Sequence, residues 1–337
     1  MDWFEKLTGF CETSYDDTKT KLEVDGSRLQ SMVNGKSYGI GELELVSLQA
    51  LRERVKSAGG LPGRLKVSMV TGDVRQMHQS RENAGALFQV ASQFNLLEMT
   101  GPEVTPEHGV TRYQHDRTQG PACAIAAGAA TIYRNYFAPV NGSDGQTARR
   151  QFDGLADLGG ALGMALNKPV EALWSMQNGY ALCTRAGLDV IADHLGALQP
   201  EQINILRGKL CIGVQHDVEV TDATGEHWPL VSQAFCSALP VSYTRVPPSH
   251  WGPFASLVLE AAYEATMSAA VLNAQRGASN VVLLTQLGGG AFGNHDDWIH
   301  AAMWRALKMM SEFALDVRLV SYGTPSREIL QMAEDFH

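Results

Sequence analysis

The sequence VVLLTQLGGGAFGN, residues 281–294, decides the fold, because an apolar strand runs directly into three glycines. A helix is predicted shortly afterwards, over 297–314. In an α/β sheet such a loop lies at the carboxyl end of a strand, where ligands bind. Its backbone N–H groups can approach a phosphate closely, helped by the positive end of the helix. A turn that needs glycine only for its backbone conformation is the alternative. Three glycines followed by Ala-Phe-Gly-Asn exceed that need, so we favour an anion-binding loop.

Strands and helices alternate on both sides of this loop. Strands are predicted at 65–73, 86–95, 209–221, 230–243, 280–287 and 316–323. Helices are predicted at 254–275 and 297–314, in most of 122–207, and at the C-terminus. The pattern is typical of an α/β fold with a mixed sheet. A Gly/Pro break at 58–63 separates an expected N-terminal cap, residues 1–60, from the α/β part, residues 61–337. In the cap, Asp25-Gly26 and Asn34-Gly35 predict turns between β-type segments.

Composition limits the class of protein. The 337 residues are 45% hydrophobic and carry a net charge of −9, which argues against nucleic acid or an anionic membrane as a partner. No apolar run approaches the roughly 20 residues of a membrane span. The N-terminus MDWFEKLTGF lacks the positive charge and apolar core of a secretory signal. Five scattered cysteines without metal-ligand spacing indicate reduced thiols. We therefore expect a cytoplasmic protein with no metal and no cofactor.

A second motif, VSMVTGDVRQ at residues 67–76, ends a strand in Gly-Asp. The carboxylate of Asp73 would lie at the same edge of the sheet as the glycine loop. There it can accept a hydrogen bond from an amino group such as adenine N6. Capping of the next helix by Asp73 explains the motif equally well.

The order strand–GDV, strand–ASQFN, long loop, strand–ALPV, strand–GGGAFGN, strand–SYG resembles the macrodomain superfamily. The resemblance covers about residues 65–323 and is interrupted by a helical insertion at about 122–207. It implies a three-layer α/β/α mixed sheet, with ADP-ribose as the ligand. Several macrodomains and their poly(ADP-ribose) glycohydrolase relatives remove ADP-ribose from proteins. The pattern looks most similar to the bacterial-effector-type branch that releases ADP-ribose from modified ubiquitin.

The resemblance also implies roles for individual residues. Asp73 and the Val74 amide would bind adenine, and Tyr322 would stack on it unless it is simply a partly buried aromatic residue at a strand end. The diphosphate and distal ribose would be wrapped by Gly288, Gly289, Gly290, Ala291, Phe292, Gly293 and Asn294, with Phe292 over a sugar. The family's NAAN segment is VASQFN here, so Ser92, Gln93 or Asn95 would take the place of its ribose-binding asparagine. The family's first glycine-rich loop, which carries paired glutamates in the glycohydrolases, is replaced by EHGVTRYQHDRTQGPA.

The catalytic assignment must therefore come from other carboxylates. Cleavage at the anomeric carbon passes through an oxocarbenium-like state, and a carboxylate can hold ribose hydroxyls, activate water or bind the leaving group. Three groupings qualify: Asp116 with Gln119 nearby to orient a sugar, Asp217 and Asp222 in QHDVEVTD, and Asp296 with Asp297 after the glycine loop. Strand alternation would put Asp217 and Glu219 on one face. The alternatives are a local pair of Asp116 with Arg117, a solvated hairpin face, and capping of a helix by Asp296 and Asp297.

Together these features predict an ADP-ribosylhydrolase acting on a modified protein, with arginine-linked ADP-ribose on ubiquitin as the narrower expectation. A non-catalytic module that binds ADP-ribose or another nucleotide metabolite is the alternative. A loop that serves a different phosphorylated metabolite, such as a sugar nucleotide, is a third possibility. The first two differ in whether a candidate carboxylate points into the pocket, because fold alone does not determine function.

Overall fold

The central element is a seven-stranded mixed sheet. The computed structural model describes residues 1–59, 61–224 and 228–336, so Gly60 at the expected cap boundary and His337 at the end of the expected α/β part lie outside it. The strands run in the order β4 (Glu42–Ser47), β11 (Cys211–Glu219), β12 (Leu230–Cys236), β6 (Leu87–Ala91), β13 (Val281–Leu284), β14 (Asp316–Ser321) and β5 (Lys66–Thr71). The strands expected in the α/β part are all present.

Five neighbouring strands of this sheet run parallel. β12 pairs parallel with β6, β6 with β13, β13 with β14, and β14 with β5. β11 is antiparallel to both β12 and β4. The carboxyl ends of β5, β6, β12, β13 and β14 therefore meet at one edge, which is where open α/β sheets bind ligands.

Helices cover both faces of the sheet, which confirms the predicted three layers. One face packs against α3 (Leu48–Ser57), α10 (Gly252–Gln275) and α11 (Asp296–Met309); the other packs against α4 (Val74–Gln79), α5 (Gln119–Ala126) and α6 (Gly128–Tyr136). Side chains along β13 alternate between the two faces of the sheet. Val282 and Leu284 pack in the hydrophobic core on the α10 side, whereas Val281 and Leu283 pack in the core on the α5 side. A strand buried on both faces is apolar throughout, as VVLL is.

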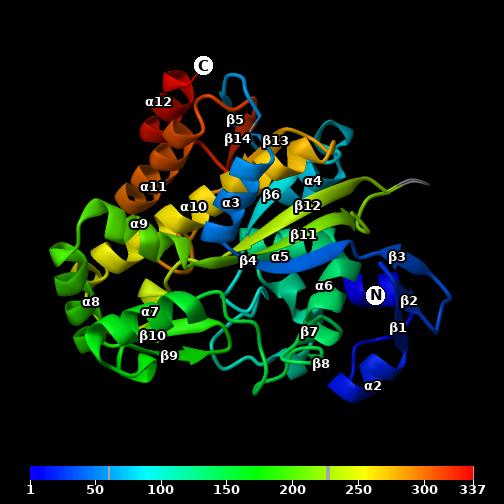
Figure 1. Cartoon of the computed structure of the whole chain (residues 1–337). Coiled ribbons are helices and arrows are strands. Elements are labelled where there is room, and N and C mark those ends of the chain that lie inside the picture. Colours follow the sequence, from blue (N-terminus) through cyan, green and yellow to red (C-terminus); the bar gives the residue numbers. More distant parts are fainter. Residues whose placement is uncertain (60, 225–227, 337) are drawn as a thin grey trace.

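Helix α10 is long and apolar enough to cross a membrane by length and composition alone. However, 83% of its apolar window is buried inside the structure. Its central position against the sheet accounts for this composition (Figure 1).

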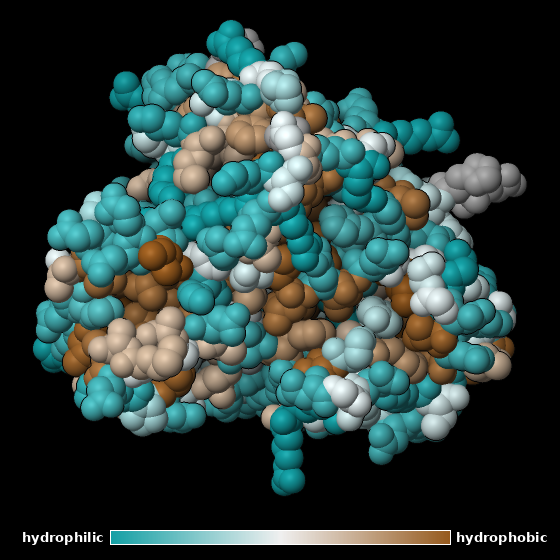
Figure 2. Space-filling view, viewed as in Figure 1, coloured by the Kyte–Doolittle hydropathy of each residue, from teal (hydrophilic) through white to brown (hydrophobic). Residues whose placement is uncertain are grey.

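On the face seen in Figure 2, hydrophobic residues form separate areas among hydrophilic ones, as on ordinary folded domains.

The N-terminal region forms a small unit beside the main sheet. Helices α1 (Trp3–Thr8) and α2 (Tyr15–Thr20) accompany a three-stranded antiparallel sheet of β1 (Leu22–Asp25), β2 (Arg28–Ser31) and β3 (Ser37–Gly39). The turns predicted at Gly26 and Gly35 are confirmed, since both residues have positive φ. The apolar residues of this unit share a core with those of α6, and the unit lies beside α6 in Figure 1. β4 and α3, which also fall within residues 1–60, belong to the central layers.

The insertion is only partly helical. Helices α7 (Ala156–Leu166), α8 (Arg185–Ala197) and α9 (Pro200–Gly208) form one side of the molecule in Figure 1. Residues 170–183, predicted to be helical, instead contain a hairpin of β9 (Trp174–Gln177) and β10 (Tyr180–Cys183). The reason is the turn between them, where Asn178 and Gly179 have φ of 46° and 80°, as an Asn-Gly hairpin turn requires. A short pair, β7 (Pro139–Val140) and β8 (Ser143–Asp144), was also not predicted.

We expect Gly179→Ala to lower the free energy of unfolding by about 2 kcal/mol. Besides its positive φ, a Cβ at Gly179 would lie 2.7 Å from both Asn95 Cγ and Gln93 Cβ. Gly196→Ala is the matched control, because Gly196 lies in α8 with open space around it, and alanine should stabilise that helix. Urea denaturation measures both. Equal stability of Gly179→Ala and the parent chain would contradict the hairpin.

Candidate active site

A cleft of about 720 Å³ lies at the carboxyl edge of the parallel strands. Each parallel strand contributes the residues that follow it: Asp73 after β5, Ser92 after β6, Ala238 after β12, Thr285 after β13 and Tyr322 after β14. Segments that are far apart in the sequence therefore share one site. The volume falls in the range of small-molecule and cofactor sites.

The glycine loop divides into residues that line the cleft and residues that hold the loop. Gly288, Gly290, Ala291 and Phe292 line the cleft, whereas Gly289, Gly293 and Asn294 do not. Gly288 has φ of 77°, and a Cβ there would lie 2.4 Å from Ala238 Cβ. Asn294 is buried; its Nδ2 donates to Leu239 O at 2.8 Å, and its backbone N–H donates to Gly288 O at 2.9 Å. Asn294 thus fixes the loop against the segment after β12.

Asp73 both caps a helix and lines the cleft, so the two interpretations of the GDV motif are compatible. It is the N-cap of α4, and its Oδ1 accepts a hydrogen bond from Arg75 N at 2.8 Å. Val74 and Arg75 line the same wall. The carboxylate is thereby held at the sheet edge, where a ligand amino group can reach it.

The residues after β6 separate in a similar way. Ser92 and Gln93 line the cleft, whereas Asn95 is fully buried elsewhere, with its Nδ2 donating to Gln151 Oε1 at 2.8 Å. Gln119 lines the cleft too, but its side-chain amide is bonded to β6, accepting from Ala91 N and donating to Gln89 O at 2.8 and 2.9 Å. Of the three residues proposed for the ribose-binding position, Ser92 and Gln93 line the cleft, and the side-chain oxygen of Gln93 accepts a hydrogen bond from Met99 N.

Aromatic side chains form part of the cleft wall. Phe292 lies with its ring 5.3 Å from that of Tyr180 and 5.5 Å from that of Tyr243, separations typical of aromatic contacts. Tyr180 lies in the unpredicted hairpin, and Tyr243 follows the ALPV segment; both were missed as site residues. Tyr322 also lines the cleft and is 83% exposed. The alternative of a partly buried Tyr322 is therefore wrong.

Of the five candidate carboxylates, only Asp116 lines the cleft. It follows the short 3₁₀-helix η3 (Thr111–His115) within the long loop, and its Oδ1 accepts hydrogen bonds from the backbone N and the hydroxyl of Thr118 at 2.8 and 2.7 Å. No ion pair joins it to Arg117 among the described residues. Both contacts from Thr118 are made to the same oxygen, which orients the carboxylate at the mouth of the cleft.

The other four candidate carboxylates do not line the cleft. Asp217 pairs with Arg276 at 2.6 Å, which lowers the pKa of that carboxyl. Asp217 has a φ of 54° and lies at a β-bulge between Gln215 and Val218. The bulge interrupts the strand alternation that was expected to put Asp217 and Glu219 on one face. The carboxylate of Asp222 accepts two hydrogen bonds from the Arg75 guanidinium, at 2.6 and 2.7 Å. Arg75 lines the cleft, whereas Asp222 does not. Asp296 and Asp297 are exposed in the first turn of α11, where acidic residues stabilise a helix.

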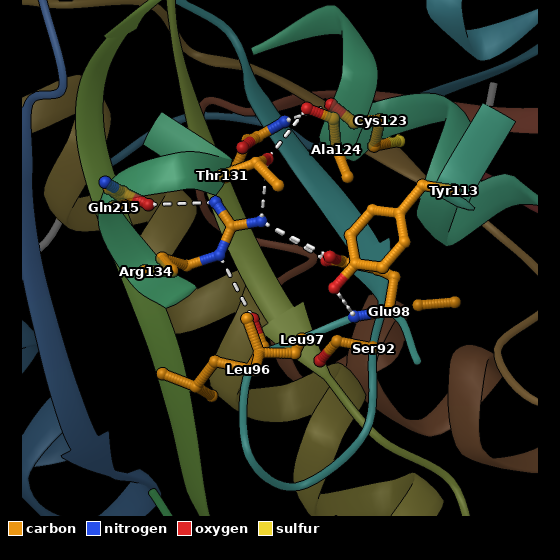
Figure 3. Close-up of polar contacts among 12 residues, drawn as sticks. Ser92, Leu96, Leu97, Glu98, Tyr113, Cys123, Ala124, Thr131, Arg134 and Gln215 are labelled. Carbon is orange, nitrogen blue, oxygen red and sulfur yellow. Dashed lines mark hydrogen bonds and ion pairs between the residues drawn. The ribbon is translucent and has the colours of Figure 1, made fainter. Parts of the chain in front are cut away.

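The structure adds a carboxylate that sequence reasoning missed. Glu98 lines the cleft although it is only 1% exposed, and Arg134 Nη2 lies 3.4 Å from both of its carboxylate oxygens. Arg134 is fully buried and also donates to Leu96 O, Gln215 Oε1 and Thr131 Oγ1; Figure 3 shows its guanidinium at the centre of these contacts. Burial raises the pKa of Glu98 to about 7 despite the arginine. The sequence signal that could have identified Glu98 was its position as a charged residue in the apolar stretch FNLLEM, residues 94–99.

Within the described ranges, no group of three or more His, Cys, Asp or Glu side chains is arranged to hold a metal ion. The cysteines are all free thiols, and Cys123, Cys183 and Cys236 are buried. Burial raises the pKa of the Cys236 thiol to about 12, so it is protonated at neutral pH. The side chains that line the cleft include carboxylates, amides, hydroxyls and the guanidinium groups of Arg75 and Arg117.

Comparison with known proteins gives distant structural similarity only. No family model matches the chain, and no curated protein matches it. It is similar to the poly(ADP-ribose) glycohydrolase from Deinococcus radiodurans in complex with ADP-ribose, with 11% identity over 87% of this chain and 92% of that chain and a TM-score of 0.46. It is also similar to the Thermomonospora curvata enzyme bound to the inhibitor ADP-HPD, with 12% identity, coverage of 92% and 94%, and a TM-score of 0.44.

Proposed function

We propose that this protein binds ADP-ribose in the cleft and hydrolyses the bond between ADP-ribose and a modified protein. One observation carries the proposal: the GDV motif, the residues after β6, the glycine loop and Tyr322 converge on one cleft. These are the segments that the macrodomain pattern assigns to adenine, distal ribose and diphosphate. Their convergence at the carboxyl edge of the sheet is the arrangement that such a ligand needs.

We infer an orientation for the ligand from the order of the lining residues. Adenine would lie between Asp73 and Tyr322, at the ends of β5 and β14, which are neighbours at the sheet edge. The diphosphate would follow the backbone of Gly288 and Gly290. The distal ribose would then reach Ser92 and the ring of Phe292. Its anomeric carbon would face the side of the cleft that holds Asp116.

Asp116 would assist cleavage at that carbon. Water attacks C1″ of the distal ribose while the bond to the protein side chain breaks, and the bonding electrons leave with the protein group. A carboxylate stabilises the oxocarbenium-like state and accepts the proton of the attacking water. The Thr118 contacts, both to Oδ1, leave Oδ2 to meet the sugar or the water. These roles use only groups of this chain.

The narrower proposal concerns the linkage and the protein. An arginine-linked ADP-ribose suits a carboxylate at the mouth, because carboxylates recognise a guanidinium through paired hydrogen bonds. A second hollow of about 450 Å³, lined by Thr100, Arg112, His115, Asp116 and Arg117, adjoins the cleft there and leaves room for the modified protein. We propose ubiquitin carrying arginine-linked ADP-ribose as the first substrate to test. The free thiols suit a reducing compartment, which supports our proposal of a cytoplasmic location.

The test is release of ADP-ribose from arginine-ADP-ribosylated ubiquitin by the parent chain and by Asp116→Asn. We expect the parent to release it and Asp116→Asn to lower kcat about 100-fold, with ADP-ribose affinity unchanged within a few-fold. Asp193→Asn is the matched control, because Asp193 is exposed on α8, outside the cleft residues. An Asp116→Asn variant as active as this control would contradict the role of Asp116.

The alternative function is a non-catalytic ADP-ribose reader. It is favoured by the absence of the glycohydrolases' paired glutamates from the long loop. A reader would bind ADP-ribose and leave every modified protein intact. Trials with ADP-ribosylated arginine, serine and glutamate side chains distinguish this outcome from a wrong choice of linkage.

A further inference from the structure

Glu98 is held in an unusual place for a carboxylate. It lies on the wall of the cleft, yet the protein buries it almost completely, together with the guanidinium of Arg134. A buried charge is costly unless it is paired and hydrogen-bonded. This carboxylate therefore depends on a fully buried arginine as its partner beside the site.

The contacts of Arg134 show that Glu98 is weakly held by its partner. Arg134 makes bonds of 3.0 to 3.1 Å to Leu96 O, Gln215 Oε1 and Thr131 Oγ1, and its guanidinium stacks 3.9 Å from the Phe235 ring centroid. Its contacts to both carboxylate oxygens of Glu98 are longer, at 3.4 Å. Charged N–H···O bonds are normally about 2.7–2.9 Å. Neutral acceptors thus hold the arginine, and the carboxylate is left without a short bond from it.

The loop after β6 carries both Ser92, which we expect to contact the sugar, and Glu98, and both residues line the cleft. Gln93 Oε1 accepts from Met99 N at 2.6 Å, and Gln93 N donates to Leu97 O at 2.9 Å, so the loop folds back on itself. Figure 3 shows Ser92 and Glu98 on this same loop. Gly120 of α5 packs tightly against this region, since a Cβ there would lie 1.9 Å from Ala91 O and 3.2 Å from Glu98 Cγ. Because Ser92 and Glu98 line the same cleft, we infer that a ligand seated on Ser92 lies beside Glu98.

We propose that Glu98 is the proton donor of the hydrolysis. This inference rests on the proposed function. As the bond between C1″ and the leaving atom breaks, its electron pair stays on the leaving atom, which takes the proton of the Glu98 carboxyl. The oxygen of water bonds to C1″, and the proton of that water passes to Asp116. Solvent then returns a proton to Glu98 and takes one from Asp116, so that both residues regain their starting states.

The surroundings of Glu98 suit a carboxyl that donates a proton near neutral pH. Three titratable groups face it from three elements: Arg134 of α6, Tyr113 of η3 and Cys123 of α5. Glu98 N donates to the Tyr113 hydroxyl at 3.2 Å. Burial raises the pKa values of both Tyr113 and Cys123, so these two groups stay neutral and only Arg134 favours the charged carboxylate. Burial outweighs that arginine and raises the pKa of Glu98 to about 7.

The experiment compares the parent chain, Glu98→Gln and Glu98→Asp on ADP-ribosylated ubiquitin from pH 5.5 to 9. For the parent we expect kcat to fall as pH rises through about 7, because only the protonated acid donates. Glu98→Gln should lower kcat at least 100-fold, remove this fall and keep ADP-ribose affinity within a few-fold. Glu98→Asp should recover part of kcat and should again show a decrease of kcat as pH rises. Asp193→Asn is again the control.

The outcomes separate the two proposals. If the parent chain neither binds ADP-ribose nor releases it, the proposed function fails. If the parent releases ADP-ribose but Glu98→Gln keeps both its rate and the fall near pH 7, the proton-donor role of Glu98 is overturned. Circular dichroism checks that the variants fold. If Glu98→Gln does not fold, the pH profiles of kcat for the parent chain and Glu98→Asp provide the test. A parent kcat that is constant from pH 6 to 9 would contradict the proton-donor role of Glu98.

Discussion

Gly290→Trp should weaken ADP-ribose binding by more than about 100-fold. Gly290 lines the cleft, its φ lies outside the positive range that favours glycine, and a Cβ there would have nothing within 4 Å. An indole at this position can therefore occupy the space of the ligand without straining the loop. Gly288 is unsuitable for this test, because its positive φ and the nearby Ala238 would disturb the loop itself.

The matched control is Gly196→Trp, in which the same side chain is added to an exposed position on α8. We expect this variant to bind ADP-ribose as the parent does. Calorimetric titration gives both affinities, and thermal melting shows that both variants fold. If Gly290→Trp bound ADP-ribose as tightly as Gly196→Trp, the ligand would not use the glycine loop.

Arg134→Met should lower the free energy of unfolding by about 3–5 kcal/mol, because it leaves Glu98 without its buried counter-charge. It also removes the donors to Leu96 O, Gln215 Oε1 and Thr131 Oγ1. Urea denaturation at pH 8 measures the loss. Combining it with Glu98→Gln should recover part of the stability, since no charge then remains buried.

Arg54→Met provides the comparison, because Arg54 pairs with Glu44 at 2.8 Å with side chains 47% and 34% exposed. An exposed pair of this kind contributes less than about 1 kcal/mol. A loss below about 1 kcal/mol in Arg134→Met would show that Arg134 and Glu98 are not a buried pair. The contrast between the two arginines thus tests the network of Figure 3 directly.

Local patterns predicted the layers and the edge of the sheet at which the cleft lies. VVLL followed by glycines and VSMVT followed by Gly-Asp each mark a strand and its carboxyl end, so Asp73, Gly290 and Phe292 could be placed from their own segments. The Asn178-Gly179 turn carried an equally local signal, but the apolar residues around it read as one long helix. A hairpin and the cleft residue Tyr180 were missed as a result.

The carboxylates were harder to place because their positions depend on tertiary contacts. Asp217 lies within a β-bulge that the residue types do not indicate, although Asp tolerates the left-handed backbone better than most residues. Glu98 and Arg134 lie 36 residues apart in the chain, each in an apolar segment. A buried charge in one such segment implies a partner in another, but the sequence alone does not say which.

Calorimetric titration of the full chain with ADP-ribose, with AMP and ribose 5-phosphate as controls, tests directly whether the cleft binds this ligand. We expect a dissociation constant of about 10 μM or tighter for ADP-ribose and much weaker binding of both fragments, because neither fills the cleft from Tyr322 to Phe292. No heat of binding and no thermal shift at millimolar ADP-ribose would contradict this expectation.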